Sequence, residues 1–337
     1  MFKSDIKLNF IKIISLILVV ISLVSTKYVG NYISIDKSSY IIALIFNTLS
    51  KIGLPMFFMV TGAILLNKDY NRKKNFIRIK KIILYIILFA IIYYLFDKYV
   101  MYKQNLSFLK YLFNPDNEIL KFNYCLLFIY ITLPFIKSMT DNMNRSMDRL
   151  FIICFLVLIG LVNAFRLTLP VEIPIFAGAY YFGYFVIGYI IYKYRNRFIF
   201  NKRNYIFLTI FILSFLSLFG STLFMSNTLN IHYDNLIDYK NILVMTEGIS
   251  LYILLYNNFP DIRSDIIKFI SKHVHITFML SELIFGLILK YFNVIKVNSV
   301  IGIPYLSMVV LVFSFIIGLL MKKIPLFETV FNIKIKD

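Results

Sequence analysis

The sequence predicts an all-α, polytopic membrane protein with about ten transmembrane helices. Of its 337 residues, 60% are hydrophobic and only 16% are charged, whereas soluble domains contain about 45–50% apolar and about 25% charged residues. The apolar residues gather in repeated runs of about 17–25 residues, a length that crosses the hydrocarbon core of a bilayer as a helix. Because backbone polar groups in lipid must be satisfied within their own segment, we expect each run to be helical.

The expected spans follow one another along the chain without a segment that would separate two domains. We therefore predict a single transmembrane domain over residues 1–337. Because no small-residue cleavage site follows the first run, we expect it to remain as a helix rather than to be removed as a signal peptide. The expected spans are 8–27, 41–66, 82–100, 122–139, 150–166, 176–194, 205–226, 241–257, 273–292 and 300–321.

Some of these spans differ from a plain apolar helix. The first contains a positive charge, Lys12, about one turn inside its start. The second holds Pro55 and a small Thr-Gly pair, which predicts a bent helix that packs closely against its neighbours. The eighth and ninth spans each contain a carboxylate near the middle, Glu247 and Glu282.

The distribution of Lys and Arg predicts the orientation in the membrane. With the N-terminus inside, the inner segments hold more than twice as many of these residues as the outer segments. Such an excess is typical of cytoplasmic loops, so we expect a plasma-membrane protein with both termini in the cytoplasm. The net charge of +19 has the same explanation, and we predict no binding to nucleic acid.

One inner segment, "NKDYNRKKNFIRIKKI" (67–82), concentrates seven of the basic residues. It is typical of a segment that fixes topology and contacts anionic lipid, at about 1 kcal/mol per basic residue. The same charges also suit a landing site for a phosphorylated cytosolic cofactor. The only two cysteines, Cys125 and Cys154, lie in separate apolar runs, and we expect neither a disulfide nor a metal site.

Ionisable side chains within membrane spans are costly and therefore candidates for function. Lys12 and Lys51 are expected near helix ends, from which a long side chain reaches the interface. Glu247 and Glu282 are too short to do so. His275 is expected at the inner entrance of the ninth span, where a solvated helix start is the alternative to a functional role.

Four stretches, in order along nearly the whole chain, are similar to signatures of the family-3 membrane acyltransferases, including those that acylate cell-envelope polysaccharides. "KIGLPMFFMVTGAILL" resembles the second-helix pattern "VPLFFxxSGYLL" of that family. The other three are "NFIKIISLILVVISL" in the first helix, "FNYCLLFIYITLPFI" in the fourth and "YYFGYFVIGYIIYK" in the sixth.

The resemblance implies chemistry by an Arg on the first helix and a His eleven residues later. Eleven residues make about three turns, so the two side chains share one face about 16 Å apart. Here Lys12 stands at the Arg position and Leu23 at the His position. The family also often ends a late motif in His-Glu, where this chain has Ser281 before Glu282. Both expected imidazoles are therefore absent.

The resemblance further implies an acyl-CoA donor, acetyl-CoA first, without a metal, and a hydroxyl of an envelope polysaccharide or glycolipid as acceptor. In the enzyme hypothesis Lys12 holds donor phosphate, and Glu247, Glu282 or His275 replaces the missing base. Lys12, Ser15 and Val19 would then border a cavity open to the cytosol. The alternative for each carboxylate is a structural hydrogen bond or ion pair.

Two other functions stay open at this point. The absent His fits a catalytically degenerate family member that handles or exports a glycan or lipid. A channel or ion-coupled carrier fits less well, since polar residues within the spans are sparse. The sequence does not predict the acyl group, the acceptor or the oligomeric state.

Overall fold

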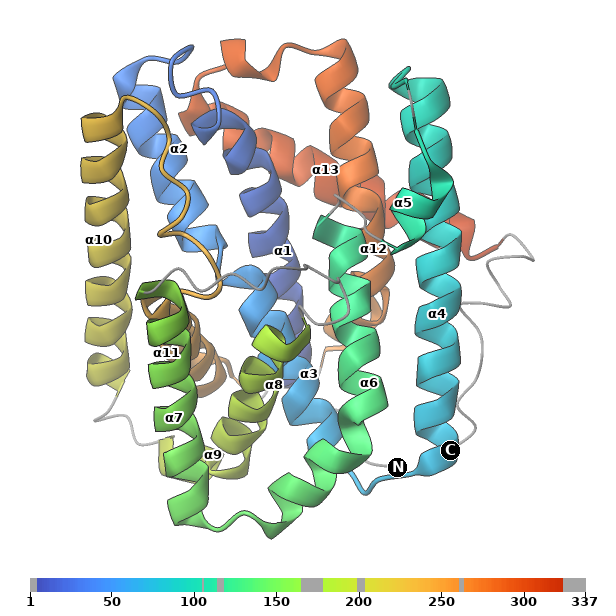
Figure 1. Cartoon of the computed structure of the whole chain (residues 1–337), viewed down its shortest axis with the longest axis vertical. Coiled ribbons are helices and arrows are strands. Elements are labelled where there is room, and N and C mark those ends of the chain that lie inside the picture. Colours follow the sequence, from blue (N-terminus) through green and yellow to red (C-terminus); the bar gives the residue numbers. More distant parts are fainter. Residues whose placement is uncertain are drawn as a thin grey trace.

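The computed structural model describes residues 5–104, 106–113, 118–164, 178–198, 204–260 and 264–323. Within these ranges the chain is a bundle of helices without a strand (Figure 1). The long helices are α1 (Ile6–Val29), α2 (Lys37–Ser50), α3 (Gly53–Leu66), α4 (Arg72–Leu95), α6 (Glu118–Asn142), α7 (Arg145–Ala164), α8 (Gly178–Lys193), α10 (Asn204–Leu229), α11 (Ile242–Asn258), α12 (Asp265–Tyr291) and α13 (Ser299–Met321).

The shorter elements join these helices. A π-helical turn (Phe96–Val100) extends α4, α5 (Phe108–Phe113) precedes α6, α9 (Arg195–Phe198) follows α8, and a 3-10 turn (Val294–Lys296) precedes α13. Many of the helices begin at a side-chain cap, which satisfies a backbone N–H that has no partner inside the helix. The caps with such a hydrogen bond are Asp5, Asp36, Asn71, Asn241, Ser264 and Asn298.

The helices confirm an all-α membrane protein. Seven segments in the described part of the chain are long and apolar enough to cross a bilayer, and α2 and α3 together form one of them. The other three expected spans correspond to α7, α8 and α11, of which α8 and α11 have only 16 and 17 residues. Parts of the expected spans 150–166 and 176–194 lie outside the described residues.

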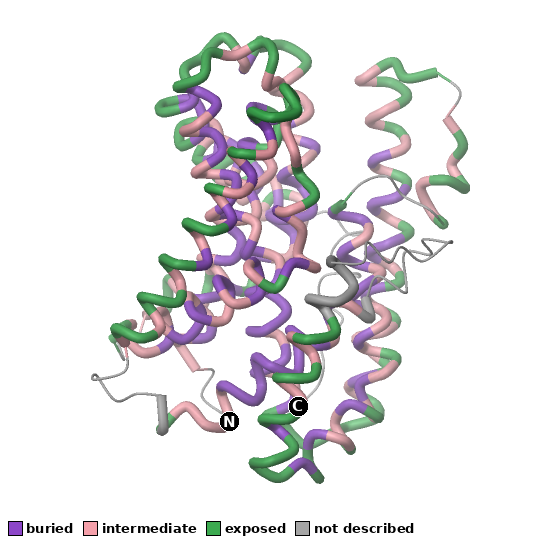
Figure 2. The backbone as a smooth tube through the Cα atoms, turned by 60° about the vertical axis from the view of Figure 1, so that its left-hand side comes forward, coloured by how far each residue is buried: buried purple, intermediate pink, exposed green. Residues whose placement is uncertain are grey.

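Large apolar side chains on the outside of the bundle show where lipid would lie. Leu213 and Phe224 on α10 and Ile301 and Met308 on α13 are all more than half exposed. Figure 2 shows buried backbone running through the middle of the bundle, with exposed residues at its ends and along its outer faces. Such a surface is suited to hydrocarbon rather than to water.

The second span is bent, as the sequence predicts. Residues 51 and 52 form a turn between α2 and α3. Pro55 cannot donate a backbone hydrogen bond to the Lys51 carbonyl, which weakens the helix at this point. Lys51 lies at the end of α2, as expected for a lysine near a helix end, but this end is a break inside the apolar segment 37–66 rather than the end of that segment.

The closest helix contact joins α3 to α8 through two glycines. A Cβ atom placed on Gly62 would lie 1.8 Å from the Phe185 carbonyl oxygen, and one on Gly188 would lie 2.1 Å from the Met59 carbonyl oxygen. Small residues allow membrane helices to approach in this way. The α3–α8 pair thus fixes the middle of the bundle.

The two ends of the bundle can be recognised from the connections. The α1–α2 and α12–α13 connections lie at one end, where the Tyr28 hydroxyl donates to the Val294 carbonyl at 3.0 Å. The α3–α4 and α6–α7 connections lie at the other end, where the Lys137 ammonium donates to the Leu66 carbonyl at 2.8 Å (Figure 1). We call them the outer end and the inner end, after the predicted orientation.

Helices α1 and α12 pack side by side and run in the same direction, from the inner end to the outer end. Near the inner end the Lys12 ammonium contacts the Ser271 carbonyl. Towards the outer end Tyr28 contacts Val294, just beyond α12. This parallel pair places the functional candidates of the first and ninth spans beside each other.

Candidate functional site

Lys12 turns towards the inside of the bundle. Its ammonium donates a hydrogen bond to the Ser271 carbonyl at 3.2 Å and lies 5.7 Å from the centre of the Phe57 ring. The residue is half-buried. A cationic side chain thus lies between α1, α3 and α12, about two turns from the start of α1, rather than among lipid headgroups.

In the described part of the chain, the face of α1 at Ser15 and Val19 is covered by protein, contrary to the expectation that it borders an open cavity. Ser15 is fully buried, and its hydroxyl donates to the Ile11 carbonyl within its own helix. The backbone of α1 at Ser15 and Val19 packs against Gly53, whose added Cβ would lie 2.8 Å from the Val19 nitrogen. Helix α3 therefore covers this face of α1, and the correction follows from the close approach that Gly53 allows.

His275 lies one turn beyond Ser271 on α12. Its ring meets the Tyr85 ring edge-on, with centres 5.0 Å apart, and lies 6.1 Å from the centre of the Phe122 ring. Its Nε2 is buried and makes no hydrogen bond to any described residue. Because α12 begins at Asp265, His275 lies well inside the helix, and the expected position at the entrance of the span is wrong.

Four lysines gather at the inner end around α12, and we call them the inner lysine cluster: Lys12, Lys81, Lys272 and Lys322. Lys12 and Lys81 lie close enough to His275 to act on it electrostatically. Lys322 follows α13; burial lowers the pKa of its ammonium, and the charges of Lys81 and Lys272 lower it further. Like charges from α1, α4, α12 and the residue after α13 thus lie close enough to affect one another, and a group of ammonium ions attracts anions.

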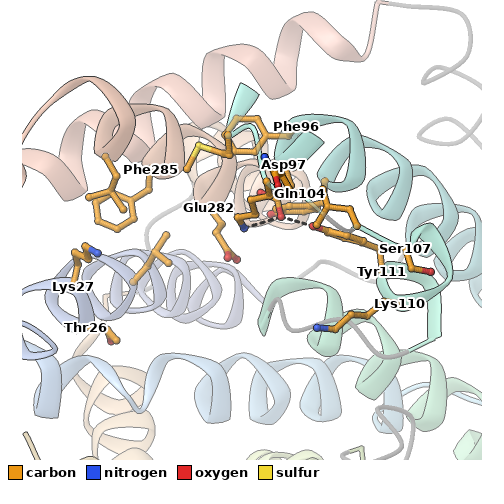
Figure 3. Close-up of a pocket in the computed structure, with 17 residues that line it drawn as sticks. Thr26, Lys27, Phe96, Asp97, Gln104, Ser107, Lys110, Tyr111, Glu282 and Phe285 are labelled. Atoms are coloured by element: carbon orange, nitrogen blue, oxygen red, sulfur yellow. Dashed lines mark hydrogen bonds and ion pairs between the residues drawn. The ribbon is translucent and has the colours of Figure 1, made fainter. Parts of the chain in front are cut away.

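At the outer end a cavity of about 630 Å³ lies between α1, α4 with its π-helical turn, α5 and α12. Glu282 lines it, and its carboxylate points into the open space in Figure 3. Leu23 and Thr26 of α1 line it together with Phe285 of α12. We call this cavity the outer pocket.

The register of the two parallel helices explains why Leu23 and Glu282 share the outer pocket. Lys12 on α1 contacts Ser271 on α12. Leu23 lies eleven residues after Lys12, and Glu282 lies eleven residues after Ser271. Eleven residues rise about 16 Å and return to nearly the same face of a helix. Leu23, which stands where the family pattern has its His, therefore faces the same pocket as the Glu282 carboxylate.

One wall of the outer pocket is held by a polar network. The Lys103 ammonium lies 2.9 Å from a carboxylate oxygen of Asp97, and the Tyr111 hydroxyl donates to the same oxygen (Figure 3). These bonds tie the segment after α4 to α5. The sequence alone gave no sign of this wall, because its residues lie in a connection between two spans.

Glu247 belongs neither to the inner lysine cluster nor to the lining of the outer pocket. It is fully buried on α11, and neither carboxylate oxygen has a hydrogen-bond partner among the described residues. The neighbouring Gly248 faces Ile52 and Met59, so this part of α11 packs on the α2–α3 break. The described residues that line the outer pocket do not include Glu247.

Comparison with known proteins gives one match. A family model described as an acyltransferase domain matches residues 5–321, nearly the whole chain. No curated protein and no solved structure matches the chain.

Proposed function

Since this membrane protein belongs to the acyltransferase-3 family, whose model covers residues 5–321, we propose that it transfers an acyl group from acyl-CoA to a hydroxyl group. Acetyl-CoA is the first donor to test, and an envelope polysaccharide or glycolipid is the acceptor. The observation that carries the proposal is the shared outer pocket of Leu23 and Glu282. The proposed location is the plasma membrane, with both termini cytoplasmic.

The donor would bind at the inner lysine cluster. Coenzyme A carries several phosphate groups, and clustered ammonium groups attract such anions strongly where water is partly excluded. Lys12 replaces an Arg of the family pattern, which keeps the charge but not the bidentate geometry. Additional lysines on α4, α12 and after α13 would compensate by adding charge from three other directions.

The acyl thioester would extend from this cluster towards the outer pocket. The two sites are separated by about 16 Å along α1 and α12, and because α3 covers the Ser15–Val19 face of α1, the arm would have to pass along α12. His275 lies on the way, and its unbonded Nε2 could hold a polar group of that arm. As the base it is less suitable than Glu282, since it lies near Lys12 rather than in the outer pocket.

Glu282 would act as the general base in place of the missing imidazole. Its carboxylate takes the proton of the acceptor hydroxyl as that oxygen attacks the thioester carbonyl. A C–O bond forms, the C–S bond breaks, and the proton passes to the departing CoA thiolate. Leu23 leaves room beside the carboxylate and supplies an apolar wall.

A catalytically degenerate protein that handles a glycan or lipid is the second candidate. The observation that favours it is Leu23 itself, since an apolar residue stands where the family pattern has its imidazole. In that case the outer pocket would bind a glycan without acyl transfer.

Acyl transfer by the purified full-length protein decides between the two candidates. With labelled acetyl-CoA and envelope glycan in lipid nanodiscs, we expect transfer that falls at least about 100-fold in Glu282→Gln, the order of a lost general base. Glu247→Gln is the matched control, because Glu247 lies outside the outer pocket, and it should keep most of the activity. Transfer that survives in Glu282→Gln would refute the role of Glu282, and no transfer by any variant would favour the degenerate protein.

A further inference from the structure

One carboxylate of the outer pocket, that of Asp97, keeps an oxygen atom without a protein partner. The Lys103 ammonium and the Tyr111 hydroxyl both donate to the Oδ2 atom of Asp97. The Oδ1 atom forms no hydrogen bond or ion pair with any residue in the described ranges. The Asp97 side chain lines the outer pocket and is 15% exposed, so a molecule in the pocket can reach this oxygen.

The backbone around Asp97 is unusual. Asp97 lies in the π-helical turn Phe96–Val100, and such turns are frequent at functional sites. Tyr102, which follows the turn, has a φ of 54°, a conformation that costs energy for any residue but glycine. The backbone N–H of Lys103 then donates to the Asp97 carbonyl at 3.0 Å. An ion pair that only stabilised the fold would not need this backbone, since a Lys four residues after an Asp on an ordinary helix already forms one.

Helix α12, which carries Glu282, holds this turn in place. A Cβ atom on Gly286, one helical turn after Glu282, would lie 3.2 Å from the Phe96 ring. One turn further along α12, the Lys290 ammonium lies 4.5 Å from the centre of the Tyr102 ring. The same helix therefore sets the positions of both carboxylates of the outer pocket, which are labelled in Figure 3.

We propose that Asp97 binds the acceptor: its Oδ1 atom accepts a hydrogen bond from one hydroxyl group, while a second hydroxyl group of the same molecule meets Glu282. The acceptor is then a polyhydroxylated molecule, as a sugar is, because an alcohol with a single hydroxyl group would lack one of the two contacts. Since Lys103 and Tyr111 already hold the carboxylate, little side-chain freedom is lost when the ligand binds. The role of the second hydroxyl group rests on the proposed function, but the contact with Asp97 does not depend on catalysis.

The test uses a panel of neutral fluorescent trisaccharides, each with all its hydroxyl groups and as a set of singly deoxygenated forms. Their binding to the full-length protein in nanodiscs is measured without acyl-CoA. For the natural sequence, we expect one deoxygenated form to bind at least about tenfold more weakly than the intact trisaccharide, as for a lost hydrogen bond to a charged group. In Asp97→Asn this difference should shrink to about threefold or less, since a hydrogen bond to a neutral amide contributes less.

Three further variants separate ligand binding from a structural role of Asp97. Asp234→Asn is the matched control and should leave the difference unchanged, because Asp234 lies between α10 and α11 and is not among the described residues that line the outer pocket. Lys103→Gln removes the ion-pair partner but keeps the Asp97 carboxylate, so it should retain most of the difference. Asp97→Glu keeps the charge but moves the oxygen, should also reduce the difference, and tests the proposal if Asp97→Asn does not fold.

The outcomes separate the two proposals. In transfer assays with envelope glycan, Asp97→Asn should raise the acceptor KM with little change in kcat, because Asp97 takes no part in the proton transfer. No binding of any trisaccharide, no difference in the natural protein, or an equal difference in Asp97→Asn would refute the role of Asp97 even if acyl transfer occurs. Loss of the difference in Lys103→Gln would assign it to the ion pair instead. An Asp97-dependent difference without acyl transfer by any variant would support acceptor binding and refute the enzymatic function.

Discussion

Lys12, a single charge in an apolar helix, is held inside the bundle by polar and aromatic contacts. Its ammonium is directed inwards, where the Ser271 carbonyl and the Phe57 ring stabilise it. A lysine that only needed to avoid lipid could have extended to the interface. The inward position beside Lys81 and His275 instead fits a side chain that meets a buried phosphate.

The charge and the shape of residue 12 can be separated by substitution. We expect Lys12→Met to raise the KM for acyl-CoA about tenfold to 100-fold, since a hydrogen bond to a charged group contributes about 1.5–3 kcal/mol. Lys12→Arg should keep or lower the KM, because guanidinium can bind phosphate through two hydrogen bonds. The measurement is the KM for acyl-CoA at fixed acceptor concentration, and an unchanged KM in Lys12→Met would contradict a phosphate contact.

At the level of elements, the α3–α8 contact fixes the frame on which α1 and α12 lie. Gly62 and Gly188 allow backbone to touch backbone, and Gly53 also lets α3 approach the backbone of α1 closely. Dispersion and close packing stabilise such contacts in lipid, where the hydrophobic effect contributes little between helices. A small change in volume at these glycines therefore has a large effect.

Gly62→Ala should lower the unfolding free energy by about 3 kcal/mol or more, since the added methyl group would overlap the Phe185 carbonyl and force α3 away from α8. Gly220→Ala is the matched control, because nothing lies within 4 Å of its added Cβ. Thermal unfolding of the purified protein in detergent measures both variants. Equal stability of the two variants would show that α3 and α8 pack more loosely than the distances at Gly62 and Gly188 indicate.

Helix positions could be predicted from the sequence, because lipid leaves the backbone few alternatives and apolar runs mark the spans directly. The break at Lys51 and the proline that causes it were also visible as a predicted bend. The pairing of Leu23 with Glu282 was not, since it depends on the register of two helices that are about 260 residues apart. Nothing local in either helix encodes that register.

The inner lysine cluster was equally hidden from sequence analysis. The basic segment 67–82 pointed to Lys81 among seven basic residues, but Lys272 and Lys322 belong to different inner segments and looked like ordinary topogenic charges. Only the packing of α4, α12 and α13 brings them together. A charge pattern along the chain shows on which side a residue lies, but not which other residues it meets.

At the scale of the whole molecule, the account requires the lysine cluster and the outer pocket to face opposite sides of the membrane. We expect Lys37→Cys to react with a membrane-impermeant maleimide in intact cells, and Lys73→Cys to react only after the membrane is opened. Both variants should carry Cys154→Ser, since Cys154 is exposed while Cys125 is buried. The reverse labelling pattern would place the donor site outside and contradict the proposed reaction.

The central claim is that Glu282 is the general base for the acceptor hydroxyl in the outer pocket, which Leu23 also lines. The most direct measurement is acyl transfer by Glu282→Gln with and without Leu23→His, beside the natural sequence, in the same nanodiscs. We predict that Glu282→Gln loses at least about 100-fold in kcat and that the added imidazole in the double variant recovers a measurable part of it. Full activity of Glu282→Gln alone would contradict the claim.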